Sequence, residues 1–360
     1  MAKRRVFALA LLLVILALVV LRLLLPDMAL AAINQRLASM GDYGGKVDDV
    51  DLAIWRGAYS LHGLRIVKTA GGVDVPLLDA PQVDIALAWR DLLRGAIVAD
   101  VDFRRPVVHF VDGGGPASSQ SGAGVDWRDQ LDAIVPIRID TVTITDGEAH
   151  FHNVHADPPV DLVASEVTAT IDNLTNVRDQ AGERVAELVA SATMFDSARL
   201  EAEARFDPFG RMDEFSLALR LLAIDLTRAN DLARAYAGID FESGTGEFVM
   251  ELEAVDGHLQ GYAKPLFRDI RIFSWRSDVQ EQGKNPFRIA WEAAVAGVAT
   301  VFRNQPADQF ATRIEISGQV GDADTSLWSA VVGVLRNAFV EALNPYFEGT
   351  TLPQRERSEQ

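Results

Sequence analysis

The sequence predicts a mostly β protein that begins with an apolar helix and carries a few other helices. Two observations lead to this fold class. Apolar and polar residues alternate with a period of two in several segments between residues 46 and 253, and an almost unbroken apolar run fills most of the first 25 residues. We therefore expect an N-terminal transmembrane helix followed by a long antiparallel twisted sheet, arranged as a β-groove or a β-sandwich with a few flanking helices.

The apolar run is long enough to cross a bilayer. It extends from Val6 through Leu16 to Leu25, is interrupted only by Arg22, and stops at Pro26. Twenty helical residues span about 30 Å, the thickness of the hydrocarbon core. Three basic residues precede the run, so the N-terminus is expected in the cytoplasm and the remaining chain on the other side of the membrane.

Two further features bear on this segment. The tripeptide Ala29-Leu30-Ala31 resembles a signal-peptidase site, so cleavage of the helix is the alternative to an uncleaved anchor. The first 26 residues hold four basic and no acidic side chains, which leaves 30 basic and 51 acidic residues, a net charge of −21, in the body. Such an acidic body is expected to stand away from an anionic membrane surface.

Alternation places the strands of the body. In the clearest case, Ala198, Leu200, Ala202, Ala204 and Phe206 share one face, and charged residues occupy the other. Asp-Gly pairs at residues 146–147 and 256–257 are expected to form hairpin turns. The strands predicted in this way are Val47–Trp55, Tyr59–Lys68, Val83–Leu87, Ile97–Arg104, Val107–Val111, Arg138–Asp146, Val163–Asp172, Ala186–Met194, Ala198–Asp207, Phe215–Ala223, Phe248–Ala254 and Phe310–Ser317.

Helices are expected to be few, and the chain divides into five segments. The predicted helices are Asp27–Ser39, Trp89–Arg94, Leu226–Ala237 with Asp225 as its N-cap, Pro286–Arg303 and Thr325–Leu343. The segments are a cytoplasmic stub and transmembrane anchor at 1–26, an N-terminal β module at 27–112, a mobile Gly/Ser-rich linker at 113–124, the main β-rich body with C-terminal helices at 125–347, and a polar tail at 348–360.

Composition excludes several classes of function. A net charge of −17 argues against a nucleic-acid partner, because no basic stripe is available to neutralise phosphates. Cysteine is absent, which removes disulfides, thiolate metal sites and cysteine nucleophiles. Neither a nucleophile elbow nor a phosphate-binding loop occurs, so we expect no catalytic residues, no enzyme activity and no cofactor.

Several segments, taken in order, resemble the AsmA-like superfamily of bacterial envelope proteins. The nearest branch is the one known as domain of unknown function 748. The hairpin pattern LxxWRGxYxLxGLxI begins at Leu52, and the similarity continues almost to the end of the chain. The later matching stretches are ADPPVDL at 156–162, NLTN at 173–176, AYAGIDFESGTGEF at 235–248, DGHLQGYAKPLFRDI at 256–270 and LRNAFVEAL at 335–343.

This resemblance implies a single-pass protein of the bacterial inner membrane with a periplasmic body. Larger members of the superfamily form open, apolar β-grooves that are thought to conduct phospholipid between membranes and so serve outer-membrane biogenesis. The expected role is non-catalytic lipid homeostasis of the cell envelope, by binding or passing phospholipid acyl chains. The alternative is a structural scaffold that recruits another envelope protein through its sheet edges.

The candidate site residues follow from these expectations. The lipid-lining candidates are Leu200, Phe206, Phe248, Met250 and Leu252, which are equally suited to an ordinary filled core. Lys264 is the candidate for contact with a lipid headgroup, and a solvated lysine at a strand edge is the alternative.

A histidine cluster offers a separate hypothesis. His150 and His152 share one face of a predicted strand, and His155 follows after a short interval. Such spacing is compatible with a metal site, although polar strand residues without a ligand show the same pattern more often. We therefore assign no metal and keep these three residues as candidate ligands.

Overall fold

The structure is a computed structural model, and it describes residues 2–38, 40–53, 57–87, 98–115, 118–122, 138–174, 185–207, 214–237, 240–273, 309–311 and 313–319. The described part is mostly β and contains one large mixed sheet of 15 strands. The predicted helices at 89–94, 286–303 and 325–343 lie outside the described residues, as does the polar tail at 348–360.

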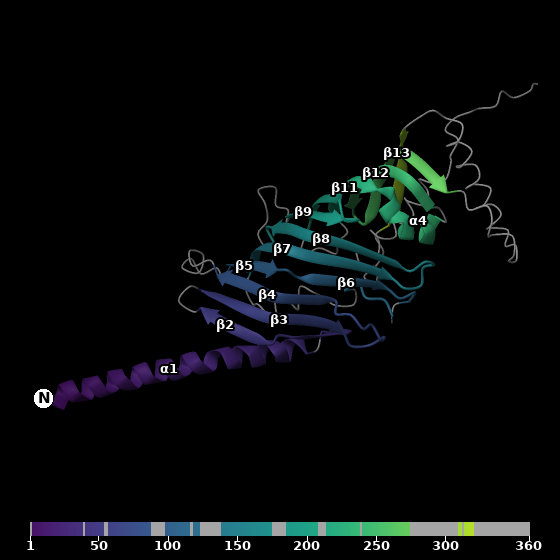
Figure 1. The fold of residues 1–360 in the computed structure, drawn as a ribbon. Coiled ribbons are helices and arrows are strands. Elements are labelled where there is room, and N and C mark those ends of the chain that lie inside the picture. The colour runs from purple at the N-terminus through teal and green to yellow at the C-terminus, as the bar shows by residue number, and fades with distance from the viewer. Residues whose placement is uncertain are drawn as a thin grey trace, which may run out of the picture.

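Helix α1 (Ala2–Leu37) begins the described chain and runs through Pro26 without a break. The helix expected at Asp27–Ser39 thus continues from the apolar segment, since a helix can pass a proline when it gives up one backbone hydrogen bond. Its first part projects away from the sheet, and its last turns lie against the first strands (Figure 1). Among the residues described here, we find no helix that has both the length and the apolar composition needed to cross a membrane.

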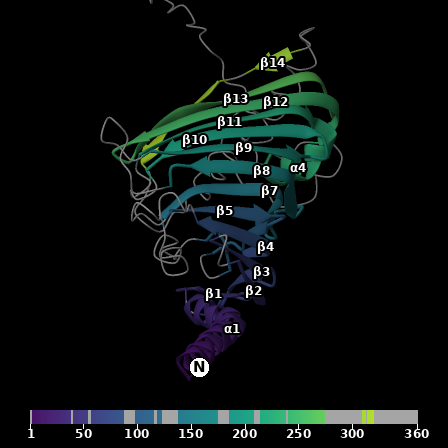
Figure 2. The ribbon, with the colours of Figure 1, turned by 90° about the vertical axis from the view of Figure 1, so that its left-hand side faces the viewer.

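The strands are long and follow one another across the sheet (Figures 1 and 2). Their order is β1-β3-β4-β5-β7-β8-β9-β10-β11-β12-β13-β14, while β2 pairs with β3, β6 with β4 and β7, and β15 with β13. The strands are β1 (Tyr43–Lys46), β2 (Asp49–Ala53), β3 (Ala58–Lys68), β4 (Leu78–Leu87), β5 (Val98–Arg104), β6 (Val107–Asp112), β7 (Arg138–Asn153), β8 (Val160–Asp172), β9 (Ala186–Met194), β10 (Ala198–Phe206), β11 (Phe215–Asp225), β12 (Asp240–Val255), β13 (His258–Phe273), β14 (Gln309–Ala311) and β15 (Ile314–Gln319).

The prediction of a purely antiparallel sheet is wrong at one place. Both β5 and β6 pair with β7 in the parallel direction, whereas the other pairs are antiparallel. β6 ends opposite Asn153, the last residue of β7, and β7 starts opposite Val98, the first residue of β5, so these strands run in the same direction. Alternation within a strand carries no information about the direction of its neighbour.

The two predicted Asp-Gly turns have different outcomes. Asp256 and Gly257 both have positive φ, 50° and 75°, and connect β12 to β13 in a two-residue hairpin. Asp146 also has a positive φ, 55°, but it lies inside β7, where the register with β8 shifts between Ile144 and Gly147. The second pair is therefore a β-bulge and not a turn.

The helix predicted after β11 is confirmed. Asp225 has extended backbone angles, and its side chain accepts a hydrogen bond of 3.0 Å from the backbone nitrogen of Thr227. The segment starts as a 3₁₀ turn, η2 (Leu226–Ala229), and continues as α4 (Asn230–Ala237). Leu226, Ala229 and Ala233 are buried against β11, β12 and β13.

The segment expected to be a mobile linker makes specific contacts where it is described. The backbone of Gln120 pairs with Val111 of β6, and its side chain is fully buried. The backbone nitrogen of Gly122 donates to the Tyr43 hydroxyl at 3.1 Å. One continuous sheet joins the strands on either side of this segment.

Candidate functional site

The register of the sheet arranges apolar side chains in rows that cross almost every strand. Two neighbouring rows lie on the same face and contain only apolar residues, glycine and one tyrosine. The first row is Tyr59, Ile85, Val101, Val142, Ile171, Leu188, Ala204, Leu217, Leu252, Gly261 and Ile316. The second row is Leu61, Val83, Phe103, Ile144, Ala169, Ala190, Ala202, Leu219, Met250 and Ala263.

We call this surface the apolar face and the opposite surface the polar face. Residues between the two rows point to the polar face, since side chains alternate along each strand. Ion pairs cross that face, including Arg205 with Glu187 at 3.1 Å and Arg268 with Glu247 at 3.1 Å. The sheet is therefore amphipathic over its whole width.

Burial varies along the apolar face. Near α1, Val83 and Ile85 are buried in a packed cluster that also contains Leu37 at the end of that helix. At the far end, Met250 is also fully buried. Between these ends Ala169 is buried, but the larger side chains are only half-buried; these are Val142, Ile144, Ile171, Leu188, Leu217 and Leu219. Among the described residues, the central strands thus carry the most accessible part of the apolar face.

All five lipid-lining candidates lie on the apolar face. Leu200 and Phe248 stand in one row through their common neighbour Leu221, and Met250 belongs to the next row. Met250 and Leu252 are buried within a packed cluster, whereas Leu200, Phe206 and Phe248 are half-buried at cluster edges. The first two therefore act as core in this structure, and the other three are available at its margin.

Lys264 lies on the polar face. Its neighbours along β13, Ala263 and Pro265, are buried on the apolar face, whereas Lys264 is exposed and opposite Val249. The structure thus separates the headgroup candidate from the lining candidates by the thickness of the sheet. The candidate anchor residues Val6, Leu16 and Leu25 all lie in α1.

Three histidines gather on the polar face. They are His109 of β6 and His150 and His152 of β7, and one ring nitrogen of each lies within 4.8 Å of the others. Partial burial lowers the pKa of His109, and the neighbouring His150 and His152 lower it further. The neutral imidazole, which is the form that ligates a metal, is thereby favoured at this position.

The sequence identified two of these three residues. His155 was expected to complete the cluster, but it lies beyond the end of β7, with an exposed side chain next to Gly114. His109 was missed because it is separated from His150 by a long stretch of chain. Its alternation within β6 was visible, but the parallel pairing that puts it opposite His150 was not.

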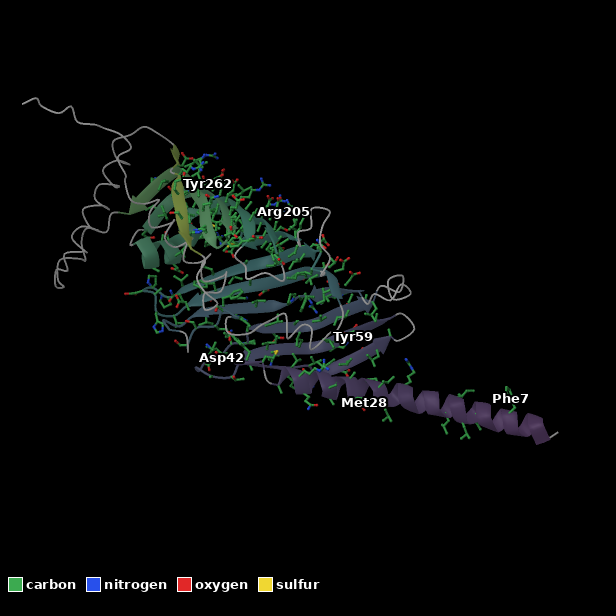
Figure 3. All side chains as sticks on the ribbon, turned by 180° about the vertical axis from the view of Figure 1, so that it is seen from behind. Phe7, Met28, Asp42, Tyr59, Arg205 and Tyr262 are labelled. Carbon is green, nitrogen blue, oxygen red and sulfur yellow. The ribbon has the colours of Figure 1, made fainter. Side chains whose placement is uncertain are left out.

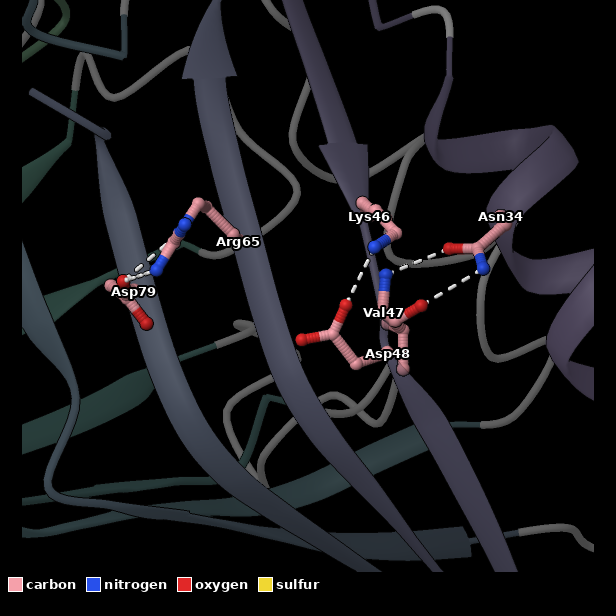
Figure 4. A network of polar contacts seen from close by, with 6 residues as sticks. All are labelled: Asn34, Lys46, Val47, Asp48, Arg65 and Asp79. Carbon is pink, nitrogen blue, oxygen red and sulfur yellow. Dashed lines mark hydrogen bonds and ion pairs between the residues drawn. The ribbon is translucent and has the colours of Figure 1, made fainter. Parts of the chain in front are cut away.

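The same face also carries an open depression of about 340 Å³ beside the first strands. Lys46 and Arg65 line it, and each is already paired with a carboxylate: Lys46 with Asp48 at 2.7 Å and Arg65 with Asp79 at 2.6 Å (Figure 4). The two positive charges are thus balanced locally, which makes the depression a poor site for a phosphate.

Comparison with known proteins adds no assignment. No protein-family model matches the chain, and a search of curated proteins finds no match. The resemblance to the AsmA-like superfamily and everything it implies therefore remain a prediction.

Proposed function

We propose that this protein binds phospholipid acyl chains on the apolar face of its sheet, without catalysis, while the first part of α1 anchors it in the bacterial inner membrane. The observation that carries this proposal is the pair of apolar rows, which run from β3 to the last strands without a charged side chain. Each methylene group moved from water to such a surface contributes about 0.8 kcal/mol.

The pattern of burial favours binding over a uniformly filled core. A closed core would bury the middle of the face at least as deeply as its ends. Here Val83 and Met250, towards the two ends, are buried, while every residue of that row between them except Ala169 is half-buried. A surface of this kind can accept an apolar chain laid across several strands, with the lipid headgroup left in water.

Evidence for the proposed membrane anchor comes from apolar side chains of α1 that do not pack against the sheet. Phe7 is 73% exposed and Leu16 is 56% exposed, on the part of the helix that projects from the body (Figure 3). Exposed apolar surface on this scale is typical of a segment that meets a membrane or a partner. The basic residues that precede this segment favour an orientation with the N-terminus in the cytoplasm and the sheet in the periplasm.

Photocrosslinking tests lipid binding in the full-length protein. A photoreactive phenylalanine analogue replaces Leu219 on the apolar face or the adjacent Ala218, which is exposed on the polar face. After irradiation in cells, mass spectrometry is expected to find phospholipid adducts at position 219 and none at 218. Absence of lipid at both positions, with both variants folded, would refute the proposal and favour a protein scaffold.

Cysteine labelling tests the topology. Because the natural chain has no cysteine, Ala2→Cys and Glu203→Cys each introduce one reactive thiol. A membrane-impermeant maleimide applied to cells with a permeabilised outer membrane should label the second variant and spare the first until the inner membrane is broken. Labelling of both, or of neither, contradicts the proposed arrangement.

A further inference from the structure

The three histidines on the polar face are brought together by the parallel pairing of β6 and β7. His109 stands directly opposite His150, and Val111 stands opposite His152. His150 and His152 are two residues apart in one strand, so their side chains leave the same face. Three imidazoles therefore project from a rigid, hydrogen-bonded part of the sheet.

Their spacing is close to that of a metal site. Nδ1 of His109 and Nε2 of His152 are 3.1 Å apart, and the three ring nitrogens lie within 4.8 Å of one another. Nitrogens bound tetrahedrally to Zn²⁺ at about 2.0–2.1 Å are about 3.3 Å from each other. The first pair thus already has nearly the required separation, and the third ring has to approach by no more than about 1.5 Å.

Two of the three rings, those of His150 and His152, also have a carboxylate partner. Oδ1 of Asp161 lies 3.2 Å from Nδ1 of His152, which leaves Nε2 of that ring directed towards His109. Oε2 of Glu148 lies 3.1 Å from Nε2 of His150 and leaves its Nδ1 available. A carboxylate on the far nitrogen fixes the tautomer of a ligating histidine and raises its basicity.

The three rings are stacked on one another. The planes of His109 and His150 differ by 28°, and those of His150 and His152 by 15°. Ligation requires the rings to turn about χ2 until their lone pairs converge, and this torsion has a broad energy profile. The side chains of His150 and His152 are 19% and 22% exposed, so there is room for that turn and for a ligand from solvent.

We propose that His109, His150 and His152 bind one divalent transition-metal ion of the zinc class. Imidazole nitrogens select Zn²⁺, Cu²⁺, Ni²⁺ and Co²⁺ over Mg²⁺ and Ca²⁺. Among the described residues, no carboxylate joins the three nitrogens in the cluster, so a fourth position remains for water or another small ligand. This site lies on the polar face and is independent of lipid binding on the apolar face.

Cobalt binding tests the site. The full-length protein, purified in detergent micelles with a histidine-free affinity tag, is stripped with a chelator and titrated with Co²⁺. One equivalent is expected to produce the visible absorption of nitrogen-bound tetrahedral Co²⁺, and Zn²⁺ should displace it. His109→Ala and His152→Ala should each abolish the absorption, whereas the control His155→Ala should retain it. Circular dichroism of the metal-free variants confirms that each is folded.

A second variant, which changes a residue that orients one of the histidines, tests the proposal even if a histidine variant does not fold. Asp161→Asn removes only the carboxylate behind His152 and is expected to weaken Co²⁺ affinity by about 10–100-fold. The proposal is overturned if the natural protein binds no Co²⁺, if binding survives His109→Ala and His152→Ala, or if His155→Ala abolishes it. Unchanged affinity in folded Asp161→Asn would overturn the assignment of that carboxylate.

Discussion

The side-chain amide of Asn34 makes two hydrogen bonds to the backbone of Val47, one in each direction. Its Nδ2 donates to the Val47 carbonyl oxygen at 2.9 Å, and its Oδ1 accepts from the Val47 nitrogen at 2.7 Å (Figure 4). Val47 is fully buried and lies between β1 and β2. Asn34 therefore satisfies a stretch of backbone outside the sheet ladder and fastens α1 to the first strands.

Replacing Asn34 should loosen this junction. Asn34→Ala leaves a buried donor and a buried acceptor without partners, and we expect a cost of about 1–3 kcal/mol in the free energy of local opening. Hydrogen–deuterium exchange of the peptide that contains Val47 measures this change directly. Arg36→Ala, at an exposed position of the same helix, is the matched control and should leave the exchange rate unchanged.

Met250 and Val249 provide a matched pair for the two faces of β12. Met250 is fully buried, whereas Val249 lies on the polar face and is half-buried. Met250→Ala should lower the free energy of unfolding by about 2–5 kcal/mol, because it leaves a cavity in a packed cluster. Val249→Ala should cost much less. Urea unfolding of both variants tests this, and equal losses would show that the faces are wrongly assigned.

Gly261 is expected to tolerate no side chain. A Cβ at this position would lie 2.1 Å from the carbonyl oxygen of Glu251 and 2.9 Å from the Cα of Leu252, which are backbone atoms of the neighbouring strand. Gly261→Ala should therefore destabilise the protein by about 3 kcal/mol or more, through displacement of β12 or β13. Gly318→Ala is the control, since its Cβ would meet nothing within 4 Å. A thermal unfolding midpoint that is equally unaffected in both would contradict the packing described for β13.

Tyr59 should make stability sensitive to alkaline pH. Burial raises the pKa of its hydroxyl from 10.0 to about 12, so the folded state favours the neutral phenol. This contribution is fully present below pH 10.0 and is lost as the pH rises towards about 12. Stability measured across this window should fall more steeply in the natural protein than in Tyr59→Phe. Identical slopes would mean that Tyr59 ionises as freely as in the unfolded chain.

Local patterns predicted many of the elements but missed β13 (His258–Phe273) altogether. Alternation placed β9 at its observed bounds, Ala186–Met194, and β10 to within one residue. The Asp225 N-cap and the start of the following helix were visible because capping depends on residues two or three positions apart. The same period of two gave the shared face of Leu200 and Phe206 within β10, and that of Phe248, Met250 and Leu252 within β12.

These local patterns could not predict which strands pair when the strands are far apart in the sequence. The Asp-Gly pair at Asp146 has the composition of a hairpin turn, yet it forms a bulge because the partner strand β8 continues past it. His109 carries no local sign of its relation to His150. Their juxtaposition depends on the parallel register of β6 with β7, which the rest of the chain imposes.

The sequence by itself determined where most of the strands form and which residues of each of them share a face, because both depend on backbone geometry that repeats every two residues. Only the tertiary structure decided the order and direction of the strands, the continuity of the apolar rows across them, and the meeting of three histidines. Those features depend on contacts between segments that are far apart in the chain. A pattern within a short stretch of sequence therefore cannot predict them.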